Sequence, residues 1–264
     1  MLALARRLSQ PVGPALDNLS VVAKHLGDYE DSLRLSAEAL TQYRATGNLA
    51  ALALGLSNRA SMCLLMDDHE QAEAHLREAA VLAEREGLTS TRAYVLANLA
   101  ELALKKQDWA AARSHAERAL ELARAGALRA LAGWLTTQLA RLAARRGEHA
   151  IARRSLAEAT GQALALDMPS LKAAVLLGLA DLVESQGHAA AARRVLAFGA
   201  EDLSLGAANR DELRAEWARR AATLREPDPP WPGLTLRELL QRVVSEADSG
   251  HAALVRQLGD TKAA

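Results

Sequence analysis

Amide side chains recur at a fixed spacing through the first half of this 264-residue chain. Asn18, Asn58 and Asn98 follow one another at one constant interval, and Gln138 continues the series at the same interval. An amide carries both a donor and an acceptor, so a row of amides can pair with the N–H and C=O groups of an extended peptide backbone. The alternative is structural, because the same side chains can cap or bridge neighbouring helices. The spacing is compatible with both roles.

An aromatic and basic group accompanies the later members of this row. It consists of Tyr94, Lys105, Trp134, Arg141 and Arg145. Tyr, Trp and Arg are enriched at the centres of protein interfaces, and Arg suits a carboxylate, so the group predicts a site for an acidic segment or a C-terminal carboxylate. Asp181 and Glu184 would repel such a ligand and so fix its position. In the alternative interpretation, Trp134 packs against an adjacent helix.

No set of side chains for catalysis can be assembled from the sequence. His75 and His115 share a register on the predicted outer surface, but a metal site needs more converging ligands. Cys63 falls in a core register, where an inert buried thiol is expected. Arg59 stands where other copies carry Leu, so it must extend its charged end to solvent or find a carboxylate. We therefore predict no enzyme activity, no catalytic residue, no metal and no cofactor.

A unit of constant length positions these side chains and occurs five times, beginning near residues 13, 53, 93, 133 and 173. The copies that begin near residues 13, 93 and 173 have apolar residues at i, i+3 and i+7, as in Leu96, Leu99 and Ala103, which is the pattern of a helix that faces a core. A turn follows, with Asp or Glu placed to cap a second helix. Both helices carry small residues in a fixed register, and Gly47 and Gly87 are expected at helix C-termini.

These columns resemble the tetratricopeptide repeat over about residues 13–200, although that repeat usually has a period of 34 residues. The period here is longer, as the successive starts show, and is similar to that of the long-helix version of the repeat. The resemblance implies an all-α fold, a right-handed α-solenoid of helix-turn-helix units whose first helices line a concave groove. Family members with this spacing hold a peptide backbone with an asparagine row. The groove residues implied here are Asn18, Asn58, Asn98, Gln138, Tyr94, Lys105, Trp134, Arg141 and Arg145.

The flanking segments complete the predicted organisation. The predicted divisions are the end of a preceding repeat or an N-terminal cap at 1–12, five repeats at 13–205, a capping helix at 206–226, and a proline-rich break, final helix and tail at 227–264. The capping helix would place Leu213, Trp217 and Leu224 on one side, because a terminal repeat needs its open face covered. Thr235 and Glu238 have the spacing of a capping box, which predicts the start of the final helix, ending near Ala247.

The C-terminal ending resembles that of large bacterial signalling ATPases and transcriptional regulators of the STAND type. Those proteins join a nucleotide-binding module to repeats of this kind, but this sequence contains no G-x-x-x-x-G-K-[ST] phosphate loop. The resemblance therefore implies a sensing or interaction module without the nucleotide-driven part.

Composition and charge restrict the function further. Half of the residues are hydrophobic but only 3% are aromatic, so the core must be built from Ala and Leu, which favours helices. The 32 basic and 32 acidic residues balance, so no overall field attracts nucleic acid or an anionic membrane. A single cysteine excludes an internal disulfide framework and suits a reducing cytosol. No apolar run reaches the roughly 18–20 residues of a membrane span, and we expect a cytoplasmic protein.

Taken together, the sequence predicts a non-enzymatic scaffold that binds a protein or peptide in its concave groove, within a bacterial regulatory system. The alternative is a structural or oligomerisation arm of a larger signalling protein. In that case the contacts, including those of a homodimer, would use the outer face or the ends of the solenoid.

Overall fold

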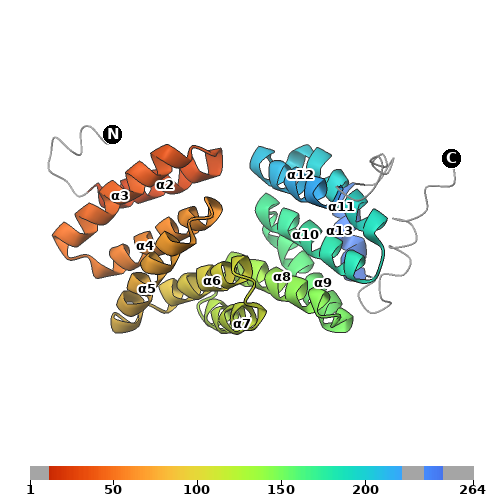
Figure 1. The fold of residues 1–264 in the computed structure, drawn as a ribbon, viewed down its shortest axis with the longest axis horizontal. Coiled ribbons are helices and arrows are strands. Elements are labelled where there is room, and N and C mark those ends of the chain that lie inside the picture. The colour runs from red at the N-terminus through yellow and green to blue at the C-terminus, as the bar shows by residue number, and fades with distance from the viewer. Residues whose placement is uncertain (1–11, 222–234, 246–264) are drawn as a thin grey trace. The chain divides into compact units, whose positions relative to one another are not determined.

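The computed structural model describes residues 12–221 and 235–245, and their regular secondary structure is entirely helical (Figure 1). Three parts of the sequence predictions lie outside these residues: the segment 1–11, the break at 222–234 with Leu224, and the tail from 246 onward. The chain divides into two compact units, one ending at Leu128 and one beginning at Arg129. The all-α prediction is confirmed.

The first unit is a succession of three helical hairpins. Its helices are α2 (Gly13–Leu26), α3 (Tyr29–Thr46), α4 (Leu49–Leu65), α5 (His69–Arg85), α6 (Thr89–Lys105) and α7 (Trp109–Ala125). Each odd-numbered helix packs against the even-numbered helix before it, and α4 and α6 also contact the preceding hairpin. The first helices of neighbouring hairpins are in contact as well, α2 with α4 and α4 with α6. This is the packing of a tetratricopeptide-like solenoid.

The second unit begins with two more hairpins and ends with two further helices. Its elements are α8 (Arg129–Arg145), α9 (His149–Leu166), α10 (Pro169–Ser185), α11 (Ala189–Glu201), the short 3₁₀ helix η1 (Leu203–Leu205), α12 (Ala207–Ala221) and α13 (Leu236–Ser245). Helix α12 packs against α11 and α10, which directly precede it in the stack. Helix α13 instead packs against α9, a helix much earlier in the sequence. The sequence did not indicate this contact.

Aspartate caps begin the second helices of the first unit as expected. The side chains of Asp28, Asp68 and Asp108 accept hydrogen bonds from backbone N–H groups three residues further on, at the starts of α3, α5 and α7. The capping box before α13 is also present, because Glu238 N–H donates to Thr235 Oγ1 while the Glu238 carboxylate accepts from Thr235 N–H. These local contacts define where the helices start.

The predicted small residues are all buried, which explains how an alanine-rich chain can pack its helices closely. In the first helices they are Ser20, Ala60, Ala100, Ala140 and Ala180; in the second helices they are Ser32, Ala72, Ala112, Ala152 and Ala192, followed by Ala39, Ala79, Ala119, Ala159 and Gly199. Gly199 breaks the alanine series for a steric reason. A Cβ at this position would lie 2.5 Å from Leu176 and 2.8 Å from Leu213 of α12.

Leu213 and Trp217 attach α12 to the second unit. Leu213 is fully buried, and the half-buried Trp217 packs against the same hydrophobic core. The buried guanidinium of Arg193 in α11 lies over the Trp217 ring at 5.9 Å from its centroid. Two of the three residues predicted to lie on one side of this helix thus contact the core.

Candidate functional site

The amide row of the first unit connects neighbouring first helices. Asn98 Nδ2 on α6 donates to the backbone oxygen of Ser57 at 2.9 Å and to its Oγ at 3.1 Å, both on α4. Asn58 Nδ2 on α4 donates to Asp17 Oδ2 on α2 at 3.3 Å. Asn18 on α2 is exposed. The amide nitrogens of Asn58 and Asn98 therefore bridge neighbouring helices, which is the structural role that the sequence left open.

Asp17 is the acceptor that sequence reasoning missed. Its carboxylate is buried, and within the described residues Oδ1 has no hydrogen-bond partner. Burial raises the pKa of Asp17, and the hydrogen bond from Asn58 only partly opposes that shift. Burial together with the nearby Asp17 charge raises the pKa of Tyr43 to about 12. The signal for this contact was the offset of 41 residues, which Asn58–Asp17 shares with Asn98–Ser57.

Exposed apolar side chains lie on the first helices of the same unit. Leu54 on α4 and Tyr94 on α6 share one register, and both are exposed, as is Leu65 near the end of α4. Because α4 and α6 are in contact, these side chains belong to adjacent helices. Lys105 at the end of α6 forms an ion pair with Asp67, with 2.5 Å between Nζ and Oδ1. The first unit thus offers apolar and amide groups, while its predicted cation is already paired.

The members of the predicted site in the second unit lie in different environments. Trp134 on α8 is half-buried and packs against the hydrophobic core, in agreement with the alternative interpretation of this residue. Gln138 is also half-buried. Arg141 and Arg145 both approach one carboxylate, Asp181 on α10, with nitrogen–oxygen distances of 2.6 and 3.9 Å. These two arginines are therefore paired within the chain.

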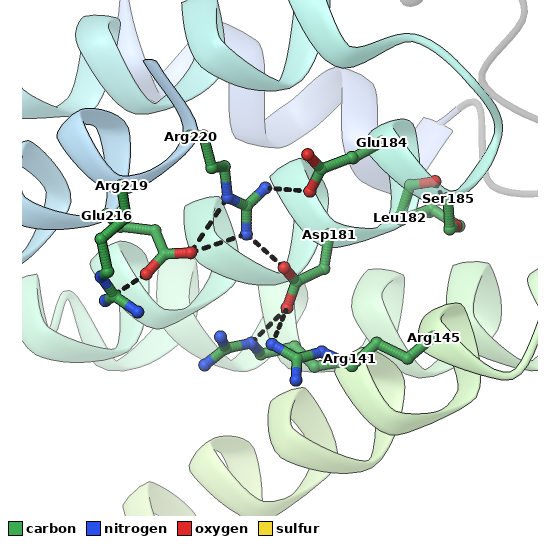
Figure 2. A network of polar contacts seen from close by, with 9 residues as sticks. All are labelled: Arg141, Arg145, Asp181, Leu182, Glu184, Ser185, Glu216, Arg219 and Arg220. Carbon is green, nitrogen blue, oxygen red and sulfur yellow. Dashed lines mark hydrogen bonds and ion pairs between the residues drawn. The ribbon is translucent and has the colours of Figure 1, made fainter. Parts of the chain in front are cut away.

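Asp181 is the centre of an ionic network that joins three helices (Figure 2). Arg220 of α12 donates to the second oxygen of Asp181 and also pairs with Glu184 at 3.0 Å and Glu216 at 2.9 Å. Arg219 pairs with Glu216 on the outer side of the network. The carboxylates that were predicted to repel an acidic ligand are thus engaged by arginines of α8 and α12.

Burial and ion pairing act in opposite directions on Asp181. Its side chain is only 4% exposed, and this burial alone would raise its pKa. Arg141, Arg220 and Arg145 outweigh the effect of burial and hold the pKa of Asp181 below its usual value. The same balance raises the pKa of Arg220, whose burial is opposed by Asp181, Glu184 and Glu216. Asp181 and Arg220 therefore carry opposite charges at neutral pH, and the network attaches α12 to α8 and α10.

Arg59 and His75 form a smaller polar contact in the first unit. Arg59 donates to the backbone oxygen of Leu33 at 2.9 Å, to Ser36 Oγ at 2.8 Å and to His75 Nε2 at 3.2 Å. Burial and the Arg59 charge lower the pKa of His75. Arg59 thus finds polar partners within the chain, but they are neutral groups and not the carboxylate that the sequence predicted.

The remaining candidates do not assemble into a reactive site. Cys63 is buried, and burial raises the pKa of its thiol, so the thiolate is disfavoured. His115 is half-buried, and burial lowers its pKa. Within the described residues no three His, Cys, Asp or Glu side chains are placed to hold a metal ion. None of the helices described here combines the length and apolar character that a membrane crossing requires.

Comparison with known families now adds to this geometry. Residues 12–85, which span α2 to α5, match the family model of the tetratricopeptide repeat. The match covers only this part of the 264-residue chain, and over these residues the helical hairpins pack as the repeat predicts. No curated protein matches the sequence. Tetratricopeptide repeats generally mediate protein–protein interactions and are typically non-enzymatic scaffolds, so the matched hairpins point to a binding function of this general kind.

Proposed function

We propose that this tetratricopeptide-repeat chain is a binding module whose first unit takes a protein segment on the face formed by α4 and α6. The observation that carries the proposal is the pair Leu54 and Tyr94, which are exposed in one register on adjacent first helices. Exposed apolar side chains that are aligned in this way suit a docked segment. Tyr94 is the expected energetic centre, because a tyrosine provides apolar area and a polar end with little conformational freedom to lose.

The amides beside these side chains contribute in a restricted way. Asn58 and Asn98 use their Nδ2 groups in contacts between helices, so the Oδ1 acceptor is the atom left to receive a backbone N–H from a partner. We infer a segment that is held by apolar contacts and positioned by these acceptors. The sequence predicted an acidic partner because of Lys105, Arg141 and Arg145. Each of these cations pairs with a carboxylate of the chain, so the three give no support to an acidic partner.

Peptide selection followed by calorimetry tests the proposal. Random peptides displayed on phage are enriched on the purified 264-residue chain, and the dissociation constant of the best peptide is measured for the wild type and two variants. Tyr94→Ala is expected to weaken binding by about tenfold or more, since truncation of an interface tyrosine commonly costs over 1.4 kcal/mol. Leu54→Ala should weaken it in the same direction.

Tyr29→Ala is the matched control for this experiment. Tyr29 lies on a second helix of the same unit, and it is 42% exposed against 39% for Tyr94. Its removal should change the dissociation constant by less than about twofold. Equal losses for Tyr29→Ala and Tyr94→Ala, or peptides that bind the Tyr94→Ala variant as well as the wild type, would contradict the assignment of the face.

The biological setting is a further proposal, which the resemblance of the C-terminal ending to bacterial signalling ATPases supports. We infer a cytoplasmic interaction module of a regulatory system, with protein rather than nucleic acid or membrane as its partner, since the formal charge of the chain is zero. Affinity capture from the native cell, compared between wild type and Tyr94→Ala, tests this setting. A regulatory protein should be lost specifically from the variant.

A further inference from the structure

Helix α2 has an apolar face that faces solvent. Its residues are Ala15, Leu19, Val22 and Leu26, at the spacing i, i+4, i+7 and i+11 that places side chains along one side of a helix. All four are exposed, and Leu26 reaches 79%. We call this set the α2 stripe. No charged residue belongs to it.

The later hairpins show that the register of the α2 stripe is normally a buried one. Val22 is 53% exposed, whereas Met62 and Leu102, which occupy the same register in α4 and α6, are 1% and 4% exposed. Ala15 is exposed, whereas Gly55 and Val95 in its register are buried. Met66, the counterpart of Leu26, is itself half exposed, so Leu26 marks the edge of the face. The difference between α2 and its counterparts is therefore centred on Val22.

In the first unit, the preceding second helix covers this register. A Cβ at Gly55 of α4 would lie 3.0 Å from Leu40 and 3.4 Å from Tyr43, both of which belong to α3. No helix precedes α2 among the described residues, so no described second helix covers the α2 stripe. Its exposed apolar side chains are suited to the side of another helix that carries apolar residues.

We propose that the α2 stripe is a dimer interface, in which α2 of one chain packs against α2 of a second copy. The stripe is self-complementary, because it is apolar along its whole length and contains no charge that a two-fold axis would bring against itself. A formal charge of zero also means that two copies do not repel one another at a distance. An isologous contact of this kind closes after two chains.

A head-to-tail arrangement fits the charges less well. The last helix of the hairpin stack in the second unit, α12, exposes Asp211, Arg214 and Arg219. These side chains already form ion pairs at the surface, Asp211 with Arg214 and Arg219 with Glu216. An apolar stripe placed against them would remove the ion pairs from water and offer them no polar partner, which is costly. The α2 stripe therefore matches another α2 better than it matches α12.

Sedimentation equilibrium of the full chain over a dilution series tests the dimer. At the highest concentrations the wild type should approach twice its mass of 28.2 kDa, and Val22→Glu should remain at 28.2 kDa. Two-fold symmetry places each substitution in the interface twice, so the dissociation constant should rise by about 100-fold or more. The control is Val81→Glu on α5, where the valine is 63% exposed and lies outside the stripe. This control should dimerise like the wild type.

Cysteine cross-linking tests the same contact without a charged substitution. In a Cys63→Ala background, Leu19→Cys or Val22→Cys should form a disulfide-linked dimer on mild oxidation, and Val81→Cys should not. A wild type that stays monomeric throughout the dilution series, or a Val22→Glu variant that associates as strongly as the wild type, would overturn the proposal. So would open-ended growth beyond the dimer. Peptide binding through Tyr94 is measured separately, so failure of one proposal does not affect the other.

Discussion

At the scale of single residues, the amide row gives a direct comparison between two asparagines in one register. Asn98 donates to both the backbone oxygen and the Oγ of Ser57, whereas Asn18 is exposed on the first described helix. Asn98→Ala should therefore lower the free energy of unfolding by about 1–2 kcal/mol, because it leaves these partly buried acceptors without their donor. Asn18→Ala should change it by less than about 0.5 kcal/mol. Urea denaturation followed by circular dichroism measures both values, and equal effects would contradict the bridging role.

The sequence predicted the register of these amides but not their partners. The constant period of the repeat places Asn58 and Asn98 on equivalent first helices, whereas the acceptor atoms depend on how far one helix is offset from the next. That offset is set by side-chain packing between α2, α4 and α6. The same limit applies to Arg141 and Arg145. Their charge was evident, but their pairing with Asp181 depends on helix contacts that the sequence pattern does not specify.

At the scale of elements, the turns between hairpins contain a testable source of strain. Gly47 and Gly87 follow their helices with φ of 66° and 67°, as predicted, and Ala127 occupies the same register with φ of 52°. The left-handed conformation destabilises a residue that has a Cβ by about 1–2 kcal/mol, and glycine avoids this strain. Glycine loses more backbone entropy on folding than alanine, which offsets about 0.5–1 kcal/mol of that advantage. Ala127→Gly should therefore raise the free energy of unfolding by about 0.5–1 kcal/mol.

The control for this prediction is Ala74→Gly, at an exposed position in the interior of α5. It should lower the free energy of unfolding by about 0.5–1 kcal/mol, because glycine is a poor helix former. Thermal unfolding of the two variants against wild type measures the opposite signs. A loss of stability for Ala127→Gly would show that the turn is not strained at this residue.

The helices themselves were predictable because every signal occurs several times. Apolar spacing, Asp caps and small residues recur in successive copies, so a weak preference in one copy is reinforced by the others. The arrangement of α13 was not predictable for the opposite reason. Its capping box and apolar residues indicate a helix, but its contact with α9 occurs once and has no counterpart in another repeat.

At the scale of the whole chain, the repeated sequence pattern explains why one helical hairpin follows another. Ion pairs between residues far apart in the sequence explain part of how the C-terminal helix α12 is attached. Arg141 and Arg220 are separated from Asp181 by 40 and 39 residues in the sequence, yet all three meet in one buried network. Balanced composition alone could not reveal this, since 32 basic and 32 acidic residues can be paired in many ways. The structure shows that α12 is held through charge as well as through Leu213 and Trp217.

The network gives a prediction for the stability of the second unit. Asp181→Asn should lower the free energy of unfolding by about 3 kcal/mol at neutral pH, because Arg141 and Arg220 lose the buried carboxylate between them. The matched control is Asp211→Asn, whose exposed carboxylate pairs with Arg214 at the surface of α12 and should contribute less than about 0.5 kcal/mol. Chemical denaturation at several pH values measures both variants.

The pH dependence of this difference follows from the direction of the pKa shift. The pKa of Asp181 in the folded chain lies below its ordinary value of 3.8, so its stabilising contribution is complete above that value. It is lost as the pH falls through the folded-state pKa, where the wild-type carboxyl becomes neutral like the Asn side chain. The gap between wild type and Asp181→Asn should therefore be constant from neutral pH down to about 5 and close only in stronger acid. A gap that closes between pH 7 and 5, or a variant as stable as the wild type at neutral pH, would mean that the ionised carboxylate does not hold α8, α10 and α12 together.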